Sequence, residues 1–75
     1  MGVEVLAVEC GLKINGLDTG RSTIRLTMGP LAFKEYQYFY VQGRSIWAVT
    51  LAVDETEWAE YEAIFVRAGE SFRVE

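Results

Sequence analysis

The stretch from Phe33 to Val53, FKEYQYFYVQGRSIWAVTLAV, constrains the fold most, because two long runs of β-favouring residues flank one turn signal. Aromatic and β-branched side chains dominate both runs, and Gln42-Gly43 lies between them. Glycine accepts the positive φ that a two-residue hairpin turn requires. The stretch therefore predicts an antiparallel hairpin with Gln42-Gly43 at its tip and Tyr38 opposite Trp47.

In this register the hairpin has two faces, because successive side chains of a strand alternate. One face is rich in tyrosine and tryptophan, and we expect it to form the main core: Tyr36, Tyr38, Tyr40 and Trp47. The other face should be polar if it met solvent, yet it is also apolar: Phe33, Phe39, Val41, Ile46 and Ala48. We therefore expect this second face to contact another copy of the chain or another protein.

The N-terminal half predicts two further strands. Residues 3–9 are apolar on both faces, so we expect a central strand or one covered on both sides. Residues 15–20 are turn-rich and predict a loop. Residues 22–28 alternate, and a three-residue connection at 29–31 would place Ile24 and Leu26 on the tyrosine and tryptophan face.

The C-terminal part predicts a helix. Asp54 and Glu57 match a capping pattern, and Gly69 would end the helix at its C-terminal side. The helix has an apolar stripe: Trp58, Tyr61, Ile64, Phe65 and Ala68. Residues 71–75 alternate and predict a last short strand. The whole chain, residues 1–75, is thus expected to be a single α+β domain with a small, strongly bent antiparallel sheet in the order β-β-β-β-α-β, for which an SH3-like barrel is a variant.

Small size favours association. A chain of 75 residues buries only about 60–65% of its unfolded surface, and domains of this size often need a disulfide, a metal or a second subunit. Cys10 is the one cysteine and there is no histidine, so neither an intrachain disulfide nor a four-ligand zinc site is possible. We expect no cofactor, and we expect a homodimer or larger assembly. Cys10 itself is expected to be a buried structural residue.

The formal charge of −4 disfavours nucleic acid as a partner, since nucleic-acid binding depends on lysine and arginine at the phosphates. The alternative stays open that the aromatic face stacks bases, with cations beside it; its residues would be Tyr36, Tyr38, Tyr40, Trp47, Arg25 and Arg44. Carboxylates on the predicted helix indicate a solvated acidic face that a basic partner could contact: Glu55, Glu57, Glu60 and Glu62.

Asp18-Thr19-Gly20 is the one motif with catalytic character. It resembles the triplet of the retroviral-type aspartic proteases, in which each subunit of a homodimer supplies one aspartate. That resemblance implies a remote alternative, a dimeric protease using Asp18. The family has a small residue where this chain has Arg21, and the same three residues are common in turns. We therefore expect a turn and no enzyme activity.

Targeting signals are not evident. The N-terminal ten residues contain two glutamates and no basic residue, unlike a secretory signal, and no apolar run approaches the ~20 residues of a membrane span. A single cysteine suits a reducing cytoplasm, or the host cytoplasm if the chain is viral. The sequence is thus interpreted as a small acidic interaction protein that binds itself or modulates another protein, in the manner of phage-encoded host modulators.

Overall fold

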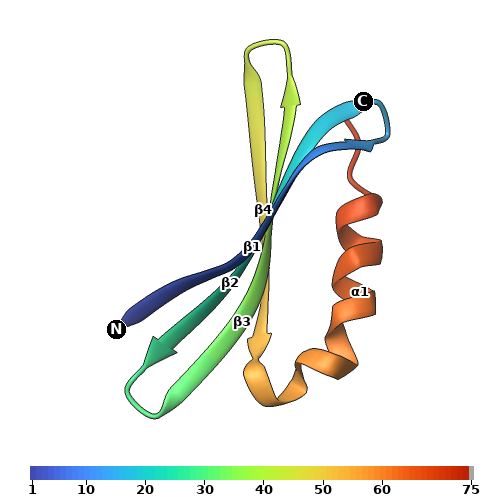
Figure 1. Ribbon diagram of the computed structural model, residues 1–75. Coiled ribbons are helices and arrows are strands. Elements are labelled where there is room, and N and C mark those ends of the chain that lie inside the picture. The colour runs from blue at the N-terminus through green and yellow to red at the C-terminus, as the bar shows by residue number, and fades with distance from the viewer. Residues whose placement is uncertain (75) are drawn as a thin grey trace.

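The computed structural model describes residues 1–74, which form an antiparallel meander followed by a helix that lies along one face of the sheet (Figure 1). The elements are β1 (Gly2–Ile14), β2 (Leu17–Met28), β3 (Leu31–Gln42), β4 (Ser45–Asp54), the 3₁₀ turn η1 (Glu55–Glu57) and α1 (Trp58–Glu70). The predicted α+β class, with a bent antiparallel sheet and a C-terminal helix, is confirmed. Over the described residues the sheet has the order β1-β2-β3-β4 and does not close into a barrel.

The central hairpin is present, but its tip is one residue further along the chain than predicted. Gln42 pairs with Ser45, and Gly43 adopts a φ of 58° in the turn. Tyr40, rather than Tyr38, therefore lies opposite Trp47. The pairing differs from the predicted one by two residues, so every side chain stays on its predicted face.

The connection between β2 and β3 is one residue shorter than predicted, and this difference changes which face of the sheet the β2 side chains occupy. Met28 pairs directly with Leu31, so only two residues turn the chain. A slip of one residue moves a whole strand to the opposite face. Ile24 and Leu26 therefore lie on the face away from α1, with Leu26 opposite Phe33, and their predicted place in the main core is wrong.

The first hairpin is also tighter than predicted. Asn15 and Gly16 have φ values of 50° and 82°, as a two-residue turn of type I′ requires. Residues 17–20 are already part of β2, so the predicted loop over 15–20 is confined to its first two residues. β1 is an edge strand rather than a central one, and it bends at two shifts in register, between Val5 and Ala7 and between Glu9 and Leu12.

The helix follows a short cap. The carboxylate of Asp54 accepts a hydrogen bond from the Thr56 amide at 2.9 Å and caps η1. α1 continues to Glu70, so the predicted end at Gly69 is wrong. Residues 71–74 form no strand, which corrects the predicted last strand, and Glu75 lies outside the described residues. Phe72 instead stacks on the Tyr40 ring, with a centroid separation of 4.0 Å.

The core lies between α1 and the sheet, as the aromatic face predicted. Its buried members are Leu17, Tyr36, Tyr38, Tyr40 and Phe65. The predicted helical stripe is correct in part: Trp58 and Phe65 pack on the core, whereas Tyr61 and Ile64 are exposed and Gly69 is buried instead. The missing side chain of Gly69 lets the helix approach closely, since a Cβ there would lie 2.3 Å from Cζ of Tyr38.

Candidate interaction surface

The sheet face turned away from α1, the open face, is apolar across all four strands. The register places its residues side by side: Val3, Val5 and Val8 of β1, Ile24 and Leu26 of β2, Phe33, Phe39 and Val41 of β3, and Ile46, Ala48 and Ala52 of β4. Within residues 1–74 no element covers this face, because α1 packs on the opposite one.

Several large side chains on the open face are strongly exposed. Ile46 is 67% exposed, Val3 65% and Val8 62%. Phe33 and Phe39 are half-buried by their neighbours on the same face. Soluble monomers rarely expose a contiguous apolar patch of this kind, and such patches mark surfaces that bind other molecules.

Four of the five interface residues predicted from the hairpin lie together. Phe39 pairs with Ala48 and Val41 with Ile46, so they form one end of the open face. Phe33 lies further along the same face, next to Leu26.

Besides Ala52 of β4, five residues of the open face on β1 and β2 were not predicted as interface: Val3, Val5, Val8, Ile24 and Leu26. The signal for the β1 members was present, because that strand is apolar on both faces. The signal for the β2 members was the apolar and polar alternation of that strand. Because the β2–β3 turn was predicted one residue too long, these side chains were assigned to the face that α1 covers.

A carboxylate lies in the middle of the open face. Glu35 is only 8% exposed and sits between Ile24 of β2 and Ala52 of β4. No hydrogen bond or ion pair within residues 1–74 involves its side chain. No side-chain oxygen within residues 1–74 is both buried and unpaired, so the Glu35 carboxylate keeps contact with solvent and is available to pair with a cationic group that a binding partner brings.

The Asp18-Thr19-Gly20 triplet lies in β2 rather than in a turn. Asp18 forms an ion pair with Lys13 at 2.6 Å on the surface, and the Thr19 hydroxyl donates to the Leu17 carbonyl at 3.0 Å. The triplet borders a hollow of about 360 Å³ on the open face, which is also lined by Phe39 and Val41. Cys10 lines the same hollow and is exposed, so its predicted burial is wrong.

The aromatic face is filled by the helix and presents no accessible stacking platform. Tyr38 and Tyr40 are 1% and 0% exposed, and the Tyr40 hydroxyl donates to the Gly69 carbonyl at 2.7 Å. The two arginines proposed to flank such a platform lie apart. Arg25 contacts the Glu55 carboxylate at 3.0 Å, and Arg44 lies in the β3–β4 turn.

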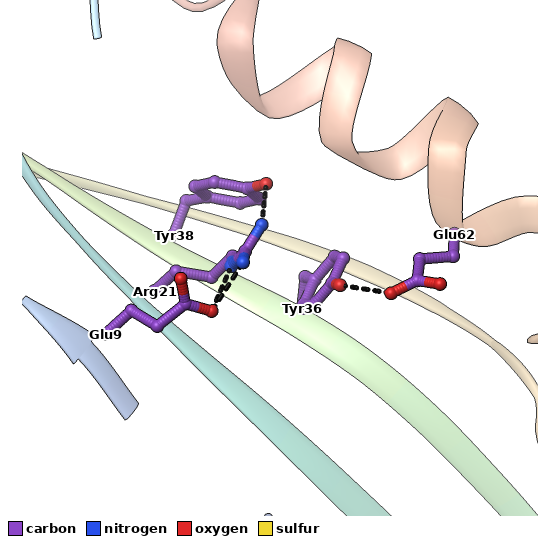
Figure 2. A network of polar contacts seen from close by, with 5 residues as sticks. All are labelled: Glu9, Arg21, Tyr36, Tyr38 and Glu62. Atoms are coloured by element: carbon purple, nitrogen blue, oxygen red, sulfur yellow. Dashed lines mark hydrogen bonds and ion pairs between the residues drawn. The ribbon is translucent and has the colours of Figure 1, made fainter. Parts of the chain in front are cut away.

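A polar network connects β1, β2, β3 and α1 beneath the helix (Figure 2). Arg21 forms an ion pair with Glu9, donates to the Tyr38 hydroxyl at 3.3 Å, and places its guanidinium 4.4 Å from the centroid of the Tyr36 ring. The Tyr36 hydroxyl donates to Glu62 at 2.7 Å. No buried side-chain nitrogen or oxygen within residues 1–74 lacks a hydrogen-bond partner, and the network holds the edge strand and the helix to the central strands.

The ionisation of the network follows from this geometry. Burial alone would lower the pKa of Arg21, but the hydrogen bonds to Glu9 and Tyr38 outweigh it and raise that pKa. Burial and the carboxylate of Glu62 raise the pKa of Tyr36 to about 12. Burial raises the pKa of Tyr40, likewise to about 12. The arginine is therefore charged and both phenols neutral at physiological pH, which suits a structural role.

The four carboxylates of the predicted acidic surface serve different roles. Glu55 is paired with Arg25 and Glu62 with the Tyr36 hydroxyl, whereas Glu57 and Glu60 face solvent. The part of the chain that the structure describes holds no group of three potential metal-ligating side chains. Among residues 1–74 there is also no helix long and apolar enough to cross a membrane.

No protein-family model matches the sequence, and no curated protein matches it. The chain is similar in structure to PA94 from Pseudomonas aeruginosa, a crystallised protein of unknown function for which a regulatory role has been suggested. The two superpose with a TM-score of 0.82 at 12% sequence identity, over 99% of this chain and 51% of PA94. This chain thus spans about half the length of PA94, and the likeness shows a shared fold alone.

Proposed function

We propose that this protein is a non-catalytic interaction protein that associates with itself and binds or modulates another protein through its open face. The observation that carries the proposal is the uncovered apolar surface across all four strands, with side chains such as Ile46 and Val8 more than half exposed. Burying apolar surface yields about 25 cal/mol per Å², so covering this face stabilises a complex strongly. The regulatory role suggested for PA94 is compatible with this proposal.

The chemistry of the face defines the partner. Most of it requires an apolar counterpart, while Glu35 at its centre favours a lysine or arginine set in that counterpart. The partner surface is therefore an apolar segment of another protein with a single basic side chain. A strongly basic partner such as a histone-like protein fits less well, because the open face has few acidic groups.

The test is the solution mass, measured by size-exclusion chromatography with light scattering at micromolar concentration. We expect at least twice the monomer mass of 8.5 kDa for the native chain, and a lower average mass for Ile46→Lys. The matched control is Tyr61→Lys, which introduces the same charge on the exposed side of α1, and we expect its mass to equal that of the native chain. A native chain that is monodisperse at the monomer mass would refute self-association.

A further inference from the structure

The two edges of the sheet differ in how they are protected. β1 carries two register shifts and three charged residues, Glu4, Glu9 and Lys13. β4 pairs with β3 without any shift over its whole length, and it has no charged residue from Ser45 to Val53 and no proline. Natural edge strands avoid unwanted pairing by bulges, charges or proline. β1 therefore has the protection of a free edge, whereas β4 has the sequence of a strand that is paired on both sides.

The side chains of β4 leave room for another strand. Those toward α1 are held in the core, whereas those on the open face after Ile46 are small and exposed: Ala48, Thr50 and Ala52. A strand added at this edge would find free backbone amides and carbonyls and no bulky side chain in its way. Figure 1 shows the β3–β4 hairpin extending beyond the end of α1, so part of this edge projects clear of the helix.

We propose that β4 pairs antiparallel with β4 of a second copy, about a two-fold axis at Val49; this rests on the self-association in the proposed function. Residues that lie opposite each other in an antiparallel pair have side chains on the same face of the sheet. Because both strands are β4, the two residue numbers must both be odd or both be even. With the axis at Val49, Ala48 lies opposite Thr50 of the second copy, and Ile46 lies opposite Ala52 of the second copy. On the open face the large Ile46 thus meets the small Ala52, on the helix side Trp47 lies opposite Leu51 of the second copy, and no like charges face each other.

Charge complementarity selects this axis and a second copy as the occupant. The same pairing brings Arg44, at the hairpin tip, opposite Asp54 of the second copy, and the symmetry repeats the contact. Arg44 has no ion pair within residues 1–74, and Asp54 ends β4 on the same face. An axis one step along, at Thr50, would place Ile46 opposite Asp54 and leave Arg44 without a carboxylate. Of these two, only the axis at Val49 places Arg44 opposite Asp54 at both ends of the paired strands.

The pairing has a structural consequence. It joins the four strands of each copy into one continuous sheet, with both helices on one side and both open faces on the other. The apolar surface available to a partner protein then doubles without being consumed by the dimer. Self-association and partner binding thus use different parts of the molecule, the β4 edge and the open face.

Distances between equivalent spin labels test the pairing. Labels are attached at Ile46→Cys, Ala48→Cys, Thr50→Cys or Ala52→Cys, each in a Cys10→Ser background. Strands rise about 3.4 Å per residue, so labels in the two copies should be closest for positions 48 and 50, at about 7 Å along the strand, and about 20 Å apart for positions 46 and 52. A profile symmetric about position 49 is expected. A dimer with any other profile would overturn the β4 pairing while leaving self-association intact, and a monomer would overturn both.

Two charge variants provide an independent test. In Ala48→Lys/Thr50→Lys like charges face each other across the axis, and we expect at least a tenfold rise in the dimer dissociation constant at low salt. In the matched variant Ala48→Glu/Thr50→Lys opposite charges meet, and we expect the dissociation constant to stay the same or fall. Equal dissociation constants for both variants would overturn the proposal. Circular dichroism of each variant confirms that the domain is folded, because both positions are exposed.

Discussion

At the scale of single residues, Gly69 decides how closely the helix approaches the sheet. It is buried inside α1 against the ring of Tyr38, which is itself fixed between Tyr36 and Tyr40. The usual gain of replacing a helical glycine with alanine is at most about 1 kcal/mol. Overpacking a fixed core costs about 1–3 kcal/mol, so the cost should exceed the gain.

We therefore expect Gly69→Ala to lower the free energy of unfolding by about 1–2 kcal/mol, measured by urea denaturation. The reason is the 2.3 Å approach between the new Cβ and Cζ of Tyr38. A double-mutant cycle with Tyr38→Leu isolates this contact, since the smaller side chain relieves the clash. If Gly69→Ala proves as destabilising beside leucine as beside tyrosine, the clash is not the cause.

At the scale of elements, the turns determined which sequence predictions succeeded. The faces of the central hairpin were predicted correctly although its tip was misplaced, because an error of two residues leaves Phe39 and Ile46 on the same side. The β2–β3 turn was misjudged by one residue, which moved Ile24 from the open face into the expected core. Local sequence does not distinguish a two-residue Gly29-Pro30 turn from a longer one, and the packing of distant strands settles it.

For the helix and the edge strand, too, local sequence did not determine which residues are buried. The helical stripe was predicted from periodicity alone, whereas Gly69 was read as a cap because glycine commonly ends helices. Its burial depends on the tyrosines of β3, far away in sequence. The place of β1 at the edge likewise depends on topology, so the valines of that strand were missed as part of the interaction surface. The Tyr36 hydroxyl and Glu62 become neighbours only after the helix docks.

The β1–β2 turn also anchors the end of α1, which gives a prediction at this scale. The Asn15 amide donates to the carbonyls of Glu70 at 3.0 Å and Phe72 at 2.7 Å. Asn15→Asp keeps a residue that tolerates the φ of 50° but removes both donors and adds a charge near the carbonyls. We expect a loss of about 1–3 kcal/mol in unfolding free energy, and faster amide exchange at the C-terminal end of α1.

Asn15→Gly is the control for this contact, because it accepts the same backbone conformation and adds no charge. It should speed exchange at the helix end to a smaller degree than Asn15→Asp. Unchanged exchange in both variants would show that stacking of Phe72 on Tyr40 holds the helix end without Asn15.

At the scale of the whole molecule, one sheet face is covered by a helix and the other is covered by nothing within residues 1–74. A sheet of this size with a single covered face is a marginal domain, since it buries a small part of its apolar surface. The polar network of Arg21 stabilises the covered side, but it cannot replace the burial that the open face lacks. Further stabilisation must come from association, at the β4 edge or on the open face, so stability and association are linked in this protein.

This linkage predicts that thermal stability depends on protein concentration. If the folded state is a dimer, mass action favours it as concentration rises, whereas the unfolded chains are monomeric. For a chain of 75 residues, we expect the midpoint of thermal unfolding to rise by roughly 5–10 °C when the concentration increases a hundredfold. Ala48→Lys/Thr50→Lys should flatten this dependence and unfold at lower temperature, because the association that stabilises the native chain is weakened. A midpoint of the native chain that is the same at 1 and 100 μM would mean that the domain reaches its stability alone, without pairing at β4.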